Sequence, residues 1–282
     1  ASLIDNAIRN AEAAPHLKNT VVSRGKYLRD NVKWKYVDLS CINERGNELI
    51  YKSLKKHLEN GNSFILGEDV ETRNSYNPGE YGGAFKVTKD LSLLFENVVH
   101  NTPISEQAIA GLATGISISG IRTFLEIMFG DFLTLTLDQV LQHASKFRRM
   151  YNNKISVPLV IRTPMGGYRG YGPTHSQSLE RFFLGIPDLT IVSINHRVSP
   201  ELIYDALSTI DDAPVIVMEN KIAYTTKVND NLNESWTYSL SSEKFPTLKV
   251  EVQKDEYDYV IICYGGILKI AEEALQTLFY DA

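Results

Sequence analysis

Short apolar runs recur through the middle of the chain, separated by stretches in which apolar residues recur at helical spacing. The runs are continuous rather than alternating, which is typical of strands in a parallel sheet covered on both faces. The pattern predicts strands at residues 63–66, 122–129, 157–161, 189–194 and 215–218.

The expected helices contain residues 50–58, 106–119 and 131–151, and a further helix begins at residue 199. Ser199 is a favoured capping residue, and Pro200 suits the first turn of that helix. Because strands and helices alternate, the chain is predicted to form an α/β fold, a doubly wound and mostly parallel sheet.

The two ends of the chain differ from this middle part. Residues 1–45 are polar and weakly periodic and are interpreted as an N-terminal extension or linker, with a short helix near residues 7–14. The main domain then covers residues 46–220, and the polar residues 221–256 form a connecting segment. Residues 257–264 and 268–279 predict one strand and one helix, which cannot bury their own apolar faces. We therefore expect residues 257–282 to be the incomplete beginning of a second α/β domain.

Composition narrows the class of protein. Hydrophobic residues make up 43% of the chain and the formal net charge is -5, so a globular core is expected and a nucleic-acid surface is not. The chain has two cysteines, far apart, which disfavours a disulfide framework or a zinc site. No apolar run is long enough to cross a bilayer and no signal pattern begins the chain, so a cytoplasmic location without membrane association is expected.

Three residues could carry chemistry, although each also has a structural explanation. His175 follows a glycine-rich loop after the strand at 157–161, where parallel sheets bind ligands. Glu106 lies in the first turn of a helix, where an acid complements the helix dipole. Phe132 suits the core. The local sequence decides none of these cases, and Ser176 lacks the surroundings of a hydrolase nucleophile.

A set of motifs in fixed order is more specific than any single residue. They are FILGEDV at 64–70, GGAFKVT at 82–88, TPISEQ at 102–107, EIM at 126–128, DF at 131–132, DQ at 138–139, HSQS at 175–178, PVI at 214–216 and EN at 219–220. From about residue 46 to 282 the chain resembles the beta subunit of the decarboxylating component of 2-oxo acid dehydrogenase complexes. This is a branch of the transketolase-like thiamine-diphosphate enzymes.

The resemblance implies a pyrimidine-binding α/β domain followed by a transketolase-type C-terminal domain. It also implies roles for the three candidates. Glu106 matches the glutamate that shares a proton with N1′ of the aminopyrimidine, which favours the tautomer that removes the thiazolium C2 proton. Phe132 matches the aromatic residue packed against the pyrimidine, and His175 the histidine near the reacting carbon.

The resemblance implies partners as well. The family's motif for magnesium and diphosphate is absent here, so those groups are expected on an alpha-type subunit or a fused alpha domain. The usual assembly contains two alpha and two beta copies, and a lipoyl acyltransferase accepts the acyl group. Some members hold potassium on backbone carbonyls, near which Leu159 and Asp211 fall.

The leading hypothesis is therefore oxidative decarboxylation of a 2-oxo acid with acyl transfer to lipoamide, active only with an alpha-type partner. Pyruvate, branched-chain acids and acetoin stay open as substrates. The alternatives are another enzyme of the transketolase-like group and a non-catalytic dimerisation domain.

Overall fold

The computed structural model describes residues 32–40, 42–72, 81–210, 212–252 and 260–281. The chain divides into two compact units. Residues 1–39 and 233–255 form the smaller one, and residues 40–232 and 256–282 form the larger one. The predicted helix near residues 7–14 lies outside the described residues.

A six-stranded sheet with the order β3-β2-β4-β5-β7-β6 forms the centre of the larger unit, and every neighbouring pair in it is parallel. Its strands are β2 (Ser63–Gly67), β3 (Val99–Asn101), β4 (Arg122–Glu126), β5 (Leu159–Met165), β6 (Thr190–Ile194) and β7 (Val215–Asn220). The α/β fold with a parallel sheet is confirmed. The short edge strand β3 was not predicted, because three residues are too few for a periodic signal.

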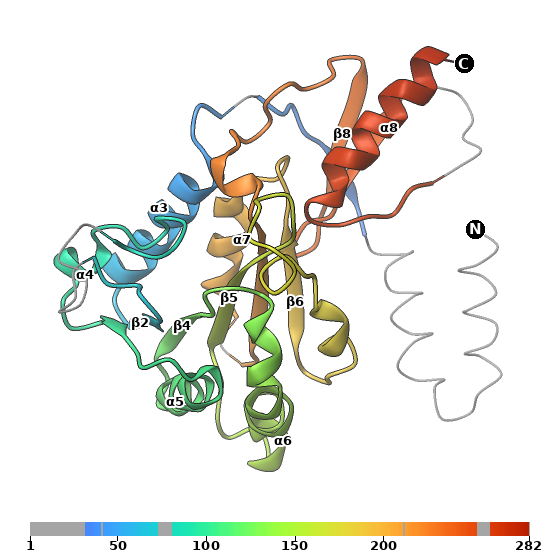
Figure 1. The fold of residues 1–282 in the computed structure, drawn as a ribbon. Helices are drawn as coiled ribbons and strands as arrows, with labels where there is room; N and C mark the ends of the chain where they lie inside the picture. The colour runs from blue at the N-terminus through green and yellow to red at the C-terminus, as the bar shows by residue number, and fades with distance from the viewer. Residues whose placement is uncertain (1–31, 41, 73–80, 211, 253–259, 282) are drawn as a thin grey trace. The chain divides into compact units, whose positions relative to one another are not determined.

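Helices cover both faces of this sheet. The longer helices that lie over the strands are α3 (Gly46–Glu59), α5 (Glu106–Ile118) and α7 (Pro200–Leu207). A further long helix is α8 (Ile267–Asp281), and α4 (Leu91–Leu94) is a single turn. In Figure 1, α5 and α6 (Phe147–Met150) lie on one side of the strands, whereas α3 and α7 pack together on the other. Every residue of β4 and β5 is therefore buried, including the charged Glu126 and Arg162.

The helix ends follow the expected local chemistry. The Ser199 side chain accepts a hydrogen bond from the Glu201 N–H at 3.3 Å, and Pro200 occupies the first turn of α7. After α3, Gly61 adopts φ +74°, a left-handed conformation in which a Cβ would be strained.

The prediction of one long helix at residues 131–151 is wrong. The segment is divided into a 3-10 helix (η1, Phe132–Thr136), a π-helix (η2, Gln139–Ala144) and α6. Thr134 and Thr136 donate hydroxyl hydrogen bonds to carbonyls three residues earlier, at 3.2 and 2.7 Å. Such bonds compete with regular helical pairing, and apolar periodicity does not reveal them.

The smaller unit is a three-stranded antiparallel sheet with the order β1-β8-β9. Its strands are β1 (Trp34–Tyr36), β8 (Trp236–Ser241) and β9 (Leu248–Val252). The N-terminal extension and the connecting segment therefore supply strands that the sequence analysis did not predict. The first and last strands are more than two hundred residues apart in sequence, and a short polar strand gives little warning of so distant a partner.

The buried strand expected at 257–264 does not form in its described part. Residues 260–264 pair with no strand of either described sheet, and Val260 and Ile262 are exposed. A run of β-branched residues becomes a strand only when a neighbour pairs with its backbone. The helix expected at 268–279 is present as α8.

Candidate active site

Polar and aromatic side chains gather where the parallel strands of the large sheet end. Glu68 directly follows β2, and Lys221 directly follows β7. Phe132 follows β4 after a short loop, and His175 lies in the loop after β5. Since the carboxyl ends of parallel strands meet at one edge, these four residues lie at the ligand-binding edge of the fold.

Glu106 is the first residue of α5, and only 8% of its surface is exposed. It is close enough to Glu68 for its charge to affect that residue. Burial, the Glu106 carboxylate and Asp69 raise the pKa of Glu68 from 4.5 to about 7, against a hydrogen bond from the Ser105 backbone N–H. Two buried carboxyl groups therefore lie together at the start of this helix, and one of them holds a proton near neutral pH.

One carboxyl oxygen of Glu68 also lacks a hydrogen-bond partner among the described residues. This oxygen, Oε1, is buried. Buried polar atoms are normally paired, so an unpaired one in a native protein indicates a ligand or a strained site. This carboxyl oxygen is therefore available to a polar group bound beside Glu106.

His175 and Phe132 are in contact, as expected for residues of one site. Their rings meet edge to face with centroids 5.2 Å apart, and the Phe129 ring lies 4.8 Å from the His175 ring in a similar arrangement. Thr174 Oγ1 lies 2.9 Å from Nδ1 of His175. Packing on two aromatic rings limits the orientations of the imidazole.

The segment that carries Phe132 packs against the helix that carries Glu106, since α5 contacts both η1 and η2. The three candidate residues therefore belong to adjoining elements at one edge of the sheet.

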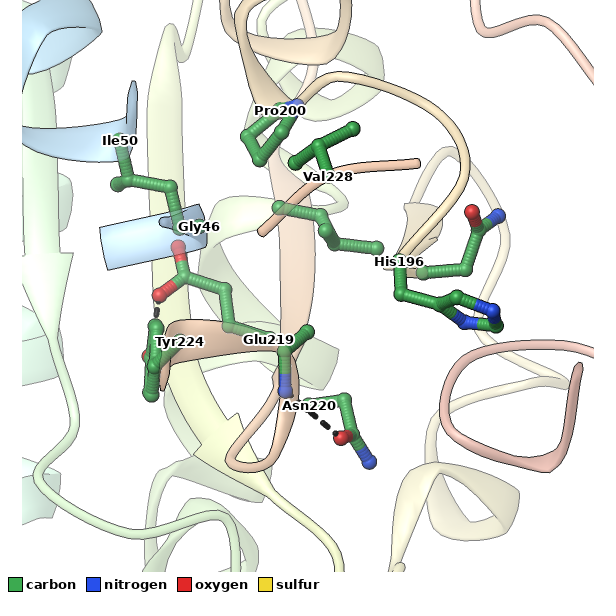
Figure 2. A pocket seen from close by; sticks show the side chains of 11 residues that line it. Gly46, Ile50, His196, Pro200, Glu219, Asn220, Tyr224 and Val228 are labelled. Atoms are coloured by element: carbon green, nitrogen blue, oxygen red, sulfur yellow. Dashed lines mark hydrogen bonds between the residues drawn. The ribbon is translucent and has the colours of Figure 1, made fainter. Parts of the chain in front are cut away.

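A second group of charges lies deeper in the sheet. Arg162 on β5 forms ion pairs with Glu126 on β4 and Glu219 on β7, and each of these side chains is at least 95% buried. The Tyr204 and Tyr224 hydroxyls both donate to Glu219, and Figure 2 shows the Tyr224 contact. Burial opposes the charge of Arg162, yet Glu126 and Glu219 hold the pKa of its guanidinium above the ordinary value. This cluster is internally satisfied.

The cavity beside that cluster cannot hold a cofactor. It is lined by Glu219, Tyr224, Asn220, His196 and Ile50, among others, and Figure 2 shows these side chains around it. Its volume of about 10 Å³ suits one water molecule. The cluster therefore joins three strands and does not form a binding site.

Metal ligands were also expected, near Leu159 and Asp211. Leu159 begins β5 and is buried, whereas Asp211 lies outside the described residues. Within the described ranges, no group of three or more His, Cys, Asp or Glu side chains could hold a metal ion. Among the helices of those same residues, none is long and apolar enough to cross a membrane.

Comparison with known proteins gives the family of the chain. The family model described as "Transketolase, pyrimidine binding domain" matches residues 48–227. The chain belongs to this family. The matched region contains Glu68, Glu106, Phe132, His175 and Lys221.

Curated relatives of this chain include proteins named as beta subunits of pyruvate, 2-oxoisovalerate and acetoin enzymes. "Pyruvate dehydrogenase E1 component subunit beta" of Gracilaria tenuistipitata var. liui is 33% identical over 83% of this chain and 68% of its own length. "2-oxoisovalerate dehydrogenase subunit beta" of Bacillus subtilis (strain 168) is 32% identical over 83% of this chain and 67% of its own length. The same organism's "Acetoin:2,6-dichlorophenolindophenol oxidoreductase subunit beta" is 32% identical over 82% and 66%. The chain thus spans about two thirds of these relatives.

One solved structure, titled "Split gene transketolase, inactive beta4 tetramer", is 19% identical over 63% of this chain and 51% of that chain. Its TM-score is 0.48. At this level the likeness bears no weight for fold or function.

Three residues of the candidate site were not singled out from the sequence. Phe129 packs against both His175 and Phe132, Lys221 is fully buried beside them, and Glu68 lies beside Glu106. Lys221 gave one available signal, because a lysine that directly follows a buried apolar strand at the ligand-binding edge is unusual.

Proposed function

We propose that this chain is the beta-type part of a thiamine-diphosphate-dependent 2-oxo acid dehydrogenase. Membership of the pyrimidine-binding family and the printed functions of the relatives support the proposal. The observation that carries it is the burial of Glu106 at the start of α5, beside a second carboxyl group.

The residues of the site fit an aminopyrimidine. Such a ring offers a basic ring nitrogen and an exocyclic amine, which need a proton donor and an acceptor. Glu106 and Glu68 are both buried, the pKa of Glu68 is about 7, and Glu68 Oε1 has no partner among the residues that the structure describes. One carboxyl can therefore donate a proton while the other accepts a hydrogen bond.

Each residue then has a distinct role. Glu106 would share a proton with the pyrimidine nitrogen through a hydrogen bond, and Phe132 would pack against the ring and orient it. His175 stabilises charge or relays a proton at the reacting carbon. The bound cofactor supplies the nucleophilic carbon and the electron sink that decarboxylation requires.

An alpha-type subunit or domain completes the proposed site and contributes most of the magnesium and diphosphate binding. A second beta copy and a lipoyl acyltransferase are the further proposed partners, in the cytoplasm. A potassium ion near Leu159 and Asp211 stays a prediction. The relatives act on different substrates according to their printed names, so pyruvate, 2-oxoisovalerate and acetoin all belong in the test.

The test is to combine the chain with its alpha-type partner and assay these substrates with thiamine diphosphate and an artificial electron acceptor. We expect cofactor-dependent turnover of at least one of them. Glu106→Gln should lower it by about 100-fold or more, because general acid–base catalysis contributes at least that factor. A partnered chain that binds no cofactor would instead be a dimerisation domain.

A further inference from the structure

Lys221 is a buried cation for which the roles proposed above give no use. It is 0% exposed and directly follows β7 at the carboxyl edge of the sheet. Burial lowers the pKa of its ammonium group, while the negative charge of Asp131 opposes that shift. Lysine is rarely buried without a specific partner, so this position calls for one.

The side chain of Lys221 is hydrogen-bonded to the loop that carries His175. Its ammonium donates a hydrogen bond to the backbone carbonyl of His175 itself. The same ammonium lies 4.8 Å from the centre of the Phe129 ring, and that ring packs against the His175 imidazole. Lys221 therefore contacts the backbone of His175 directly and supports its side chain through Phe129.

Asp131 holds the same loop two residues further on. Its Oδ1 atom accepts hydrogen bonds from the Gln177 backbone N–H at 3.1 Å and from the Gln177 side chain at 2.9 Å. Its Oδ2 atom is buried without a hydrogen-bond partner in the described parts of the chain, so the charge is offset by Lys221 through space. Asp131 also directly precedes Phe132 in the chain.

The loop needs such support because its own sequence does not fix it. Gly166, Gly170 and Gly172 all adopt positive φ, and Tyr168 to Thr174 are exposed. A loop rich in glycine has many alternative conformations. Two contacts at His175 and Gln177 restrict it where the imidazole must be placed.

We propose that Lys221 and Asp131 are positioning residues that hold His175 against Phe132 in its working orientation. This inference rests on the proposed role of His175. Neither residue needs to touch the substrate, because a misplaced catalytic group alone costs rate.

A double-mutant cycle tests the proposal in the chain assembled with its alpha-type partner. Lys221→Met removes the ammonium but keeps an unbranched side chain of similar length. We expect kcat to fall about tenfold, with the KM for the 2-oxo acid and the affinity for thiamine diphosphate changing less than about twofold. In a His175→Asn background the same substitution should have almost no effect, because it acts through His175.

Three comparisons separate positioning from general damage. Lys221→Arg keeps a cation and a donor and should restore part of the rate. Lys227→Met, six residues further on, removes an exposed lysine that hydrogen-bonds Asn43 and should leave kcat unchanged. Asp131→Asn keeps an acceptor for Gln177 but loses the charge facing Lys221, so it should lower kcat less than Lys221→Met and again not additively with His175→Asn.

Trypsin cleavage provides a measure that does not depend on activity. Arg169 lies exposed in the same loop, and cleavage there should be faster in Lys221→Met than in Lys227→Met. Equal losses from Lys221→Met with and without His175 would overturn the inference, as would unchanged kcat and unchanged cleavage. If the unsubstituted assembly itself has no cofactor-dependent activity, the proposed function fails, and this inference fails with it.

Discussion

Two groups of buried carboxyl side chains in the large unit differ in the charges that surround them. Glu126 and Glu219 share the guanidinium of Arg162, and two tyrosine hydroxyls complete the pairing of Glu219. At the start of α5, by contrast, the charges that act on Glu68 are the negative ones of Glu106 and Asp69.

The contrast distinguishes buried acids with a structural role, Glu126 and Glu219, from the buried acids of the candidate site, Glu68 and Glu106. A buried acid with a cation and hydroxyl donors is satisfied inside the protein and joins three strands. A buried acid beside another acid is costly unless it holds a proton or meets a ligand. A buried acid whose pKa is raised by a second acid is therefore a candidate functional residue.

Removing the shared cation should have the largest effect on stability. Arg162→Met leaves Glu126 and Glu219 buried without their counter-ion, which typically costs about 3–5 kcal/mol. Denaturant unfolding of the two proteins measures the loss. The matched control is Arg148→Met, which breaks an exposed pair with Asp212 and should cost less than about 1 kcal/mol. Equal costs for the two variants would show that the buried cluster is not a structural unit.

Removing the Glu68 charge should change stability with the opposite sign. The pKa of Glu68 is about 7 in the folded protein and 4.5 for an ordinary glutamate, so the folded state loses stability as the pH rises from 4.5 to about 7. Glu68→Gln removes that loss. We expect stabilisation of roughly 2 kcal/mol, or about 5 °C in Tm, at about pH 8 and almost none at about pH 4.5.

Thermal unfolding at the two pH values measures this difference. Glu59→Gln is the control, since Glu59 is an exposed acid at the end of α3 and its replacement should give no comparable pH dependence. A Glu68→Gln variant that is destabilised equally at both pH values would contradict the account of an uncompensated carboxyl.

A smaller loss is expected from the hydroxyl donors of the paired set. Tyr204→Phe removes the hydrogen bond to Glu219 while the other contacts of that carboxylate stay, so about 1 kcal/mol of stability should be lost. Tyr151→Phe, on an exposed ring, is the control in the same unfolding measurement. No difference between the two variants would mean that Glu219 does not depend on the Tyr204 hydroxyl.

The sequence predicted the frame of the fold because its strands are buried on both faces. Continuous apolar runs located β2, β4, β5, β6 and β7, and Ser199 with Pro200 located the start of α7. It failed where a partner distant in sequence decides the structure. The strands β1 and β8 depend on each other across about two hundred residues, and residues 260–264 lack a pairing strand.

For the candidate site, the order of the motifs indicated Glu106, Phe132 and His175. The sequence around each residue could not decide between a functional and a structural role. The contact of His175 with Phe132 and the hydrogen bond from Lys221 to the His175 carbonyl are tertiary contacts between residues far apart in the sequence. Glu68 lies inside the FILGEDV motif, yet its pKa is raised by burial and by the charges of Glu106 and Asp69. Neither its burial nor the approach of a carboxyl group from another element can be read from the sequence. Such contacts can be recognised only in the three-dimensional structure.

The central claim is that Glu106 forms a hydrogen bond with a nitrogen of the cofactor's pyrimidine ring and so promotes loss of the C2 proton. The most direct measurement is the rate of hydrogen–deuterium exchange at C2 of thiamine diphosphate, followed by NMR in the chain assembled with its alpha-type partner. Glu106→Gln should slow this exchange by about 100-fold or more, whereas the exposed control Glu96→Gln should leave it unchanged. Exchange in Glu106→Gln as fast as in the unsubstituted assembly, with cofactor bound, would contradict the claim.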